Sequence, residues 1–336
     1  MTDPDLARKL SCITELFKSK HILVVGDMIL DHYIDGKVQR ISPEAPIPIV
    51  EVSKEYYRLG GAANVANNLV SLGIRTSIAG MLGGDRYAGI FRDKLSEKGI
   101  SPVFLIEDTQ RSTTLKTRIM SNNHHIVRVD FEHKHYAEEN NETLLLQNIS
   151  SIIQNVDAVI LQDYNKGVLT PRIINETIQL CRLRNVPVLV DPKFTNFFAY
   201  TGCTVFKPNM KELQQNLSLE INTDAELTQA ARQLNNRLDS DYLVITRGAE
   251  GITVFEKELR TDYPSLAREV YDVSGAGDTV ISILAASLAV GLDIKNAVEC
   301  ANIAAGLVCA KAGTKPVEAT EFQKAVIRFH SNHIDA

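Results

Sequence analysis

Residues 272–280 read Asp-Val-Ser-Gly-Ala-Gly-Asp-Thr-Val, a turn of two glycines around one alanine that ends in a carboxylate. Glycine lets a backbone turn sharply and bring its N–H groups close to a ligand. An apolar run with helical character, residues 280–290, follows the turn. The N-terminus of such a helix adds its dipole and free amides, which predicts an anion site with Asp278 in the first helical turn. A carboxylate beside a site for a transferred phosphate is what a kinase needs to take a proton from an alcohol.

The same string is also compatible with a strand–turn–helix corner whose aspartate only caps the helix, because short Gly-x-Gly turns are common. It is not a P-loop, since no Gly-Lys-Ser or Gly-Lys-Thr follows the glycines. Residues 268–271, directly before the string, have the composition of a strand.

Four buried-type runs along the chain predict strands, and helical patterns follow them. The strands are expected at residues 21–26, 157–161, 188–191 and 242–246, and the helices at residues 62–72, 172–184 and 225–238. Strands that alternate with helices imply a mostly parallel sheet covered on both faces. Ligands bind beyond the C-terminal ends of the strands in such sheets. Asp27, Asp163, Asp191 and Arg247 each fall just after a predicted strand, so we expect them to converge on one edge.

Residues 33–57 and 112–131 break this alternation. Both segments are rich in β-type residues, and the second alternates polar with apolar positions, which predicts strands of a small separate sheet. One face of this sheet would cover the cleft as a lid, formed by about residues 32–58 and 112–131. Because an exposed apolar sheet face usually meets a partner, we expect a homodimer formed through the lid.

Composition narrows the class of protein. The 336 residues carry a net charge of −5 and no long basic run, so nucleic acid is not an expected partner. Five scattered cysteines without a CxxC pair indicate reduced thiols. The first residues lack the apolar stretch of a signal peptide, and the longest apolar helix falls short of the roughly 20 residues that span a bilayer. We expect a soluble cytoplasmic protein with no membrane partner.

A second glycine string, residues 60–66, reads Gly-Gly-Ala-Ala-Asn-Val-Ala. The two strings together resemble the two signatures of the PfkB-type, ribokinase-like sugar kinases. Longer strings resemble the branch of that family that acts on D-glycero-β-D-manno-heptose 7-phosphate. These strings are residues 26–31, 40–46, 116–118, 128–131, 163–167 and 191–193, and the similarity runs from about residue 21 to residue 313.

The resemblance implies a fold and an activity. The fold is a single ribokinase-like domain over residues 1–336, an α/β/α three-layer sandwich with a mostly parallel central sheet and a small β-sheet lid. The activity is phosphorylation of the heptose phosphate at its anomeric O1 with ATP and Mg²⁺, in the synthesis of ADP-heptose for lipopolysaccharide. Bifunctional members continue into a nucleotidyltransferase domain; this chain shows no HxGH-type motif, so we expect the stand-alone kinase form.

Two alternatives to that activity stay open. One is another PfkB-type kinase that acts on a sugar or a sugar phosphate such as a fructose phosphate. The other is a non-catalytic sugar-phosphate sensor built on the same fold.

Residue roles follow from the matched motifs. Asp278 is the expected general base, kept ionised by the helix-end amides, and the amides of Gly275, Ala276 and Gly277 are expected to stabilise charge on the transferred phosphoryl group. Arginine suits bidentate contact with the phosphate of the sugar. The expected substrate-binding residues are Asp31, Gly60, Gly61, Asn64, Asp163 and Lys166 for the sugar, with Arg118, Arg128, Lys116 and Lys166 for its phosphate. The competing interpretations are a surface ion pair between Asp163 and Lys166, and solvated surface positions for the lid cations.

Asn209 and Glu212 match the family's NxxE pattern, and oxygen ligands there suit Mg²⁺ held through water. The same spacing also makes a helix cap with its capping-box partner, so spacing alone does not decide between them. Some relatives need a monovalent cation such as K⁺, and the carbonyls near Asp272 are its candidate place. The other expected nucleotide-binding residues are Lys193, Thr246, Arg247, Gly248, Gly275 and Gly277 for the phosphates and Asn302 for the border of the adenine.

Overall fold

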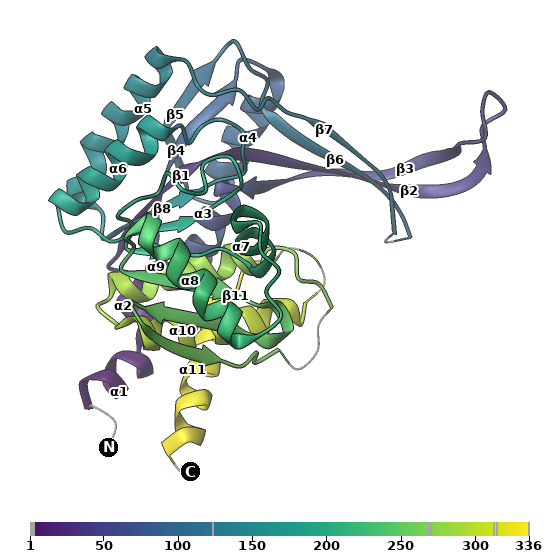
Figure 1. The fold of residues 1–336 in the computed structure, drawn as a ribbon. Helices are drawn as coiled ribbons and strands as arrows, with labels where there is room; N and C mark the ends of the chain where they lie inside the picture. Colours follow the sequence, from purple (N-terminus) through teal and green to yellow (C-terminus); the bar gives the residue numbers. More distant parts are fainter. Residues whose placement is uncertain (1–3, 123, 268–270, 312, 314, 335–336) are drawn as a thin grey trace.

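The computed structural model describes residues 4–122, 124–267, 271–311, 313 and 315–334. Within these residues a nine-stranded sheet lies between two layers of helices, and a four-stranded sheet projects from it (Figure 1). The strands of the large sheet are, in spatial order, β13 (Leu259–Tyr263), β12 (Ile252–Glu256), β11 (Tyr242–Thr246), β10 (Val205–Phe206), β9 (Val188–Asp191), β8 (Ala158–Gln162), β1 (His21–Gly26), β4 (Arg75–Gly83) and β5 (Ser101–Asp108).

The strands from β11 to β5 run parallel, and β12 and β13 extend the sheet antiparallel at one edge. β1 is buried at every position because helices cover both of its faces. Its alternate side chains point to opposite faces, so Ile22 and Val24 join one hydrophobic core while Leu23 and Val25 join the other. These two cores on either side of one sheet form the three-layer arrangement.

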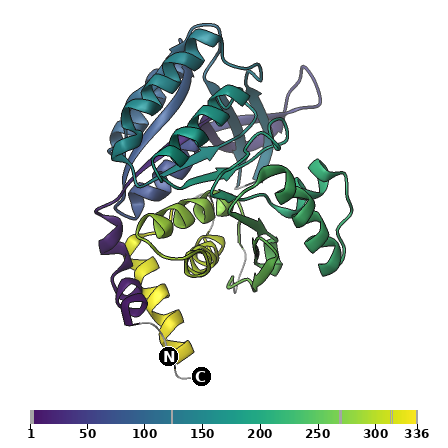
Figure 2. The same ribbon diagram turned by 60° about the vertical axis from the view of Figure 1, so that its left-hand side comes forward.

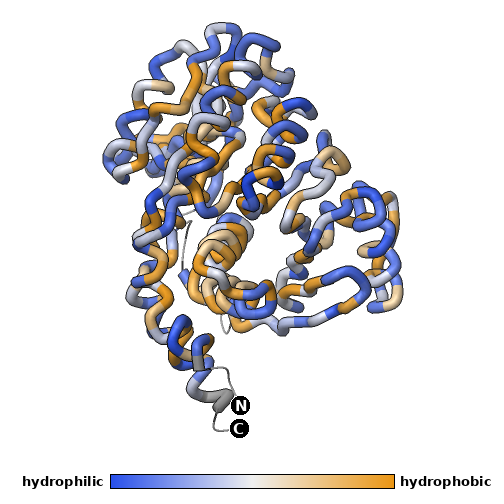
Figure 3. Tube along the Cα trace, turned by 90° about the vertical axis from the view of Figure 1, so that its left-hand side faces the viewer, coloured by the Kyte–Doolittle hydropathy of each residue, from blue (hydrophilic) through white to orange (hydrophobic). Residues whose placement is uncertain are grey.

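Helices supply the outer layers. Their bounds are α1 (Pro4–Ser11), α2 (Ile13–Phe17), α3 (Ala62–Ser71), α4 (Arg86–Glu97), α5 (Glu139–Ile152), α6 (Pro171–Leu183), α7 (Met210–Leu217), α8 (Asp224–Leu238), α9 (Ala276–Ala289), α10 (Ile294–Cys309) and α11 (Ala319–Ile334), with short 3₁₀ helices at Ile153–Asn155 and Gly248–Glu250. One core takes side chains from α3, α4, α9, α10 and α11, and the other from α5, α6, α7 and α8 (Figure 2). Hydrophobic residues gather where these helices meet the sheet, and hydrophilic residues lie on the outer turns (Figure 3).

The two ends of the described chain lie side by side (Figures 1 and 2). Phe17 of α2 stacks on Phe322 of α11 with ring centroids 6.2 Å apart. Gln323 of α11 accepts hydrogen bonds from the backbone and the hydroxyl of Thr14. The described part of the chain holds no helix that is both long enough and apolar enough to cross a membrane.

The small sheet has the strand order β3 (Pro48–Gly61), β2 (Met28–Ile41), β6 (Thr114–Ser121) and β7 (His124–Phe131). β2 follows β1 after the single residue Asp27, and β3 leads directly into α3. The hairpin is therefore rooted at the C-terminal edge of the large sheet, and its far end projects away from the body (Figure 1). Arg118 pairs in register with Tyr33 on one side and Arg128 on the other, so these three share one face of the sheet.

The structure agrees with the elements expected in the body to within a residue or two, whereas β2 and β3 of the small sheet extend beyond the expected residues 33–57. The strands predicted at residues 21–26, 188–191 and 242–246 coincide with β1, β9 and β11, and β8 begins one residue later than predicted. Residues 268–270 of the strand predicted before the glycine turn lie outside the described residues. The expected ribokinase-like α/β fold, with a large, mostly parallel sheet and a smaller sheet, is confirmed.

Candidate active site

The glycine turn leads into α9, and its backbone explains why glycine stands at its centre. Gly275 precedes the helix with a φ of 84°, a left-handed conformation that other residues adopt at a cost. A side chain at Gly277 would meet Lys207 Nζ only at 3.7 Å and Asp191 Oδ2 only at 4.0 Å. Gly277 therefore leaves room above the turn that the protein itself does not fill.

The amide of Ala276 is used inside the protein. It donates to the carbonyl of Val273 at 3.2 Å. The next amides, of Gly277 and Asp278, belong to the first helical turn and have no carbonyl within the helix to receive them. The amides of Gly277 and Asp278 therefore remain for the expected anion site. The Ala276 amide, which we expected to stabilise charge on the phosphoryl group, bonds to the protein instead.

The two glycine strings meet at Asp278. Asn64, in the first turn of α3, donates from Nδ2 to Asp278 Oδ2 at 2.6 Å. One turn further along α3, Asn68 Oδ1 accepts a hydrogen bond at 3.1 Å from the hydroxyl of Thr279, the residue after Asp278. These bonds hold α3 and α9 in register. Asn64 was expected to bind sugar hydroxyls, but in the structure its side-chain amide donates to the carboxylate of Asp278 instead.

Two further donors reach the same carboxylate from the end of β8. Tyr164 donates its hydroxyl to Asp278 Oδ1 at 2.9 Å, and Gln162 donates from Nε2 to the same oxygen at 3.3 Å. Gln162 also donates to Asp191 Oδ2 at 3.1 Å. Sequence reasoning missed both residues. The only signal was their place at the C-terminal end of a predicted core strand.

A buried ion pair lies directly beneath the glycine turn. Lys207 Nζ contacts Asp191 Oδ1 at 3.0 Å, and the lysine side chain is 3% exposed. A buried cation beside a site for a phosphoryl group is suited to stabilise negative charge there. Lys207 was not expected from the sequence, although it stands two residues before the recognised Asn209.

Burial sets the basicity of Asp278. Removal from water raises the pKa of its carboxyl group, and hydrogen bonds from Asn64 and Tyr164 only partly oppose this, so the pKa is about 6. The charge of Asp191 raises this pKa further, and that of Lys207 lowers it. We had expected helix-end amides to keep the carboxylate ionised. The observed donors are side chains instead, and burial outweighs them.

A cavity of about 530 Å³ opens beside these groups. Its lining includes Tyr164, Asp191, Lys207 and the glycine turn, together with Ala305 and Cys309 of α10. Thr246, which forms a β-bridge with Asn209, lines it as well. The cavity brings together most of the expected nucleotide residues, namely Lys193, Asn209, Thr246, Gly248, Gly275, Gly277 and Asn302.

Asn209 and Glu212 form a complete capping box. The side chain of Asn209 accepts from the backbone of Glu212 at 2.9 Å, and Glu212 Oε2 accepts from the backbone of Asn209 at 2.9 Å. The other oxygen of Glu212 is ion-paired with Lys193 Nζ. One oxygen of Glu212 is therefore already paired with the ammonium of Lys193. This arrangement suits Mg²⁺ held through water better than Mg²⁺ coordinated directly by several side chains. Among the described residues no group of three or more His, Cys, Asp or Glu side chains could hold a metal ion.

Arg247 does not face the cavity. Its guanidinium forms ion pairs with Glu250 and, at 3.5 Å, with Asp262, and its side chain is 17% exposed. The backbone turns at Gly248, which has a φ of 60°, and Gly248 lines the cavity instead. The expected contact between the Arg247 side chain and ATP phosphates is therefore corrected.

Asp163 also points away from any ligand. It accepts a hydrogen bond from the hydroxyl of Tyr200 at 2.7 Å, and its side chain is buried. Burial and the nearby charge of Asp27 raise its pKa to about 6. We no longer assign Asp163 to the sugar, and the competing idea of a surface pair with Lys166 is wrong as well.

Glycines 60 and 61 permit a close approach between the root of the lid and β2. A side chain at Gly60 would lie 2.6 Å from Asp31 Oδ2, and one at Gly61 would lie 2.4 Å from the carbonyl of Asp27. Asp31 in turn accepts from Arg118 at 2.5 Å. The expected substrate residues of both lid segments thus adjoin one another, although none of them lines the cavity at Asp278.

The lid face that carries Arg118 holds a cluster of ion pairs, which we call the lid ion-pair cluster. Lys116 contacts Asp130 at 3.1 Å and Glu132 at 3.4 Å, and Lys166 contacts Glu132 at 2.6 Å. Among the described residues the cluster contains three carboxylates and five cations, namely Asp31, Asp130 and Glu132 with Lys116, Arg118, Arg128, Lys134 and Lys166. Lys166 therefore belongs with the lid cations.

Asp272 is occupied by the loop before α9. Its Oδ1 accepts from the backbone of Ser274 at 2.8 Å, and its Oδ2 accepts from the backbone of Gly313 at 3.2 Å. Although partial burial opposes it, these amides hold the pKa of Asp272 below its ordinary value. The carboxylate ties two loop segments together, and a monovalent cation near it stays a prediction.

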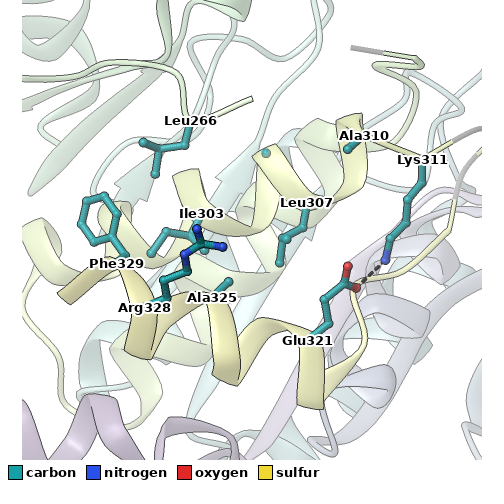
Figure 4. A pocket seen from close by; sticks show the side chains of 10 residues that line it. Leu266, Ile303, Leu307, Ala310, Lys311, Glu321, Ala325, Arg328 and Phe329 are labelled. Carbon is teal, nitrogen blue, oxygen red and sulfur yellow. Dashed lines mark hydrogen bonds and ion pairs between the residues drawn. The ribbon is translucent and has the colours of Figure 1, made fainter. Parts of the chain in front are cut away.

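A second hollow, of about 640 Å³, lies between α10 and α11 under Leu266 (Figure 4). Its walls are mainly apolar, with Ile303 and Phe329 on facing elements. The carboxylate at its rim, that of Glu321, is ion-paired with Lys311. The glycine turn and Asp278 line the other cavity, so we take that cavity as the candidate active site.

Comparison with known proteins places this site in a family. The model of the pfkB family of carbohydrate kinases matches residues 19–320. The bifunctional protein HldE of Geobacter sulfurreducens is 42% identical over 300 residues, which cover 89% of this chain and 61% of that protein. HldE of Campylobacter curvus is 39% identical, covering 94% of this chain and 66% of its own length. The chain thus spans less than two thirds of these relatives.

Solved structures support the fold. The ribokinase of Arabidopsis thaliana complexed with ribose and ATP superimposes with a TM-score of 0.72 at 18% identity, covering 91% of this chain and 98% of that one. Phosphofructokinase-2 of Escherichia coli in complex with potassium gives a TM-score of 0.76 at 16% identity, covering 93% of this chain and 99% of that one. Since the family model covers nearly all of the residues that build the site, the chain belongs to the PfkB family of carbohydrate kinases.

Proposed function

We propose that this sugar kinase transfers the γ-phosphoryl group of ATP to the anomeric O1 of D-glycero-β-D-manno-heptose 7-phosphate. The product would be the 1,7-bisphosphate, a precursor of ADP-heptose. Relatives named HldE, at about 40% identity over most of the chain, support a heptose phosphate as the acceptor. The observation that carries the proposal is the lid ion-pair cluster, because an unphosphorylated sugar needs no surplus of cations.

The charge of the lid ion-pair cluster suits a sugar phosphate. Its five cations exceed its three carboxylates by two among the described residues. A phosphate monoester carries about −1.5 to −2 charges near pH 7, so it would balance this surplus. Arg118 is the leading candidate for the direct contact, because its planar guanidinium can bind a phosphate in a bidentate manner and its side chain is held in place by Asp31.

The residues around the cavity account for the steps of the transfer. Asp278 takes the proton from the O1 hydroxyl as O1 attacks the γ-phosphorus, and ADP leaves with the electron pair of the broken P–O bond. The amides near Gly277 and the ammonium of Lys207 stabilise the charge that builds on the transferred group. Mg²⁺, when bound with ATP, supplies further positive charge at the phosphates, and Glu212 would hold it through water.

We also propose that the small sheet acts as a lid and forms a homodimer. The side chains opposite the lid ion-pair cluster include Val127, Val129 and Phe131, which are 46%, 39% and 56% exposed. Such a contiguous apolar strand face is expected to be covered by a partner. A Val129→Asp variant should then sediment or scatter light as a monomer, and an unchanged mass would place the dimer contact elsewhere or exclude it.

The test of the acceptor is ATP consumption with a panel of sugars, with Mg²⁺ and with or without K⁺. The panel contains the heptose 7-phosphate, fructose 6-phosphate, fructose 1-phosphate, ribose and adenosine. We expect strong preference for the heptose phosphate, with the new phosphate on carbon 1. Preference for a fructose phosphate would keep the kinase chemistry and overturn the heptose assignment. No turnover despite ATP binding would indicate a sugar-phosphate sensor.

A further inference from the structure

We propose that Tyr164 is the positioning residue of the general base: its hydroxyl orients the Asp278 carboxylate and leaves Oδ2 to receive the proton of the acceptor. The inference rests on the proposed role of Asp278 as the base. Its basis is the geometry of the three donors around Asp278, which come from α3, the end of β8 and the loop after it.

The backbone of Tyr164 is anchored independently of the active site. Asp27 is fully buried, and its carboxylate accepts from the amides of Tyr164 at 2.7 Å, Lys166 at 3.0 Å and Val168 at 3.2 Å. Lys193 Nζ lies 5.8 Å from the centre of the Tyr164 ring, within the range of a cation–π contact. The ring is therefore held from both ends before any ligand binds, which is what a positioning group requires.

The hydroxyl of Tyr164 keeps its hydrogen and acts as a donor. Burial raises the pKa of Tyr164 well above its ordinary value, and the charges of Asp278 and Asp191 raise it further. A protonated phenol 2.9 Å from a carboxylate oxygen donates a charge-assisted hydrogen bond. This bond favours the ionised form of Asp278, the form that can accept a proton.

The hydrogen bonds divide unequally between the two oxygens of Asp278. Oδ1 receives Tyr164 at 2.9 Å and Gln162 at 3.3 Å, whereas Oδ2 receives only Asn64, at 2.6 Å, among the described residues. Each carboxylate oxygen has two lone pairs. Oδ1 is therefore filled, and Oδ2 keeps one position for a hydroxyl. Without Tyr164 the carboxylate could rotate, and the oxygen facing the acceptor would no longer be specified.

The other charged groups that face Asp278 are unchanged by a substitution at Tyr164. Asp191 raises the pKa of Asp278 and Lys207 lowers it. Lys193 also faces this carboxylate, whose charge raises the pKa of Lys193. Loss of the phenol donor alone should therefore raise the pKa of Asp278. The base must be ionised to work. If its pKa rises, activity is therefore lost at a higher pH as the solution is acidified.

The test is Tyr164→Phe, which removes one oxygen and keeps the ring. We expect kcat to fall about tenfold, as for a lost hydrogen bond to a charged group, with KM for both substrates within about twofold of wild type. The acidic limb of kcat/KM should move up by about half a pH unit or more. The phosphate of the sugar titrates in the same range, but it does so equally in both enzymes and cancels in the comparison.

Tyr200→Phe is the matched control. Tyr200 is also a buried tyrosine, and it donates to Asp163 at 2.7 Å, away from Asp278. This variant should lose thermal stability to a similar degree as Tyr164→Phe but keep the wild-type pH profile and kcat. A purely structural role for Tyr164 would make the two variants behave alike.

A second measurement keeps the inference testable if Tyr164→Phe does not fold. Replacing Tyr164 with 3-fluorotyrosine makes the phenol a stronger donor, so the acidic limb should move to lower pH. An unmoved acidic limb in every Tyr164 variant that folds, with Asp278→Asn inactive, would overturn the positioning role and leave Asp278 as the base. An active Asp278→Asn would instead overturn the base on which the inference rests.

Discussion

The body and the lid each gather charged side chains, and they shift the pKa values of carboxyl groups in opposite directions. In the body, Asp278 and Asp191 share one buried ammonium, that of Lys207, and burial raises the pKa of Asp278 to about 6. In the lid, burial of Glu132 is outweighed by hydrogen bonds and charges from Lys166 and Lys116, which lower its pKa to about 2. A carboxyl group is thus made more basic in the body, whereas in the lid it is kept charged down to low pH.

The pKa shifts of the two regions differ because the carboxylates differ in their access to water and in the number of cations around them. The carboxylate of Asp278 is buried apart from its edge on the cavity, so desolvation dominates its pKa and neutral donors only moderate the shift. The lid ion-pair cluster has more cations than carboxylates and keeps contact with solvent, so Coulomb attraction dominates and salt can screen it. In the function proposed above, the buried carboxylate of Asp278 would serve as a base near neutral pH, and the cation-rich lid would bind the sugar phosphate.

Asp278→Asn should have the largest effect on catalysis. Without a base, kcat should fall at least about 10²-fold, while KM for ATP stays within about twofold. Asp163→Asn is the control, because Asp163 is also buried at this sheet edge but bonds to Tyr200. Steady-state kinetics of both variants would contradict the assignment if they lost activity equally or if Asp278→Asn stayed near wild type.

The same substitution should change the pH dependence of stability. The folded-state pKa of Asp278, about 6, lies above its ordinary value of 3.8, so the wild type binds this proton more tightly when folded. Its stability contribution is present below about pH 4 and lost as the pH rises to about 6. Between those limits the variant should gain about 3 kcal/mol of unfolding free energy relative to wild type, by urea titration at each pH. A constant difference from pH 4 to pH 7 would show that Asp278 is not desolvated.

Arg118→Ala tests the lid side of the comparison. Loss of a charge-assisted contact with the sugar phosphate should raise KM for that substrate by about 10- to 100-fold, with a smaller effect on kcat. The unphosphorylated heptose serves as the control substrate, since its turnover should change much less. Equal losses with both sugars would mean that Arg118 acts by holding Asp31 and not by binding phosphate.

Arg128→Ala should have the smallest effect. Arg128 pairs in register with Arg118, but its side chain is 57% exposed and its partner Asp130 also contacts Lys116. A screened, solvated cation is worth little, so KM for the sugar phosphate should rise only about two- to fivefold, and less at high salt. An effect as large as that of Arg118→Ala would indicate that the lid closes further and removes Arg128 from water.

Much of the fold was readable from local patterns. β1, β9 and β11 lie where the sequence predicted them, because strands buried on both faces show as short apolar runs. The turn at Gly275 was also readable, since glycine suits its left-handed backbone conformation. The expectation for Arg247 was wrong because its position after a strand placed its backbone at the site but not its side chain.

The sequence by itself determined the strands, the helices and the glycine turn, because these depend on the spacing of neighbouring residues. The tertiary structure alone decided that Asn64, Gln162 and Tyr164 all donate to Asp278, since they come from segments far apart in the chain. It also decided that the Asp163 carboxylate is enclosed with Tyr200, whereas that of Asp278 lines the cavity. Burial and charge pairing set the chemistry of a carboxylate, and both depend on groups that local sequence does not contain.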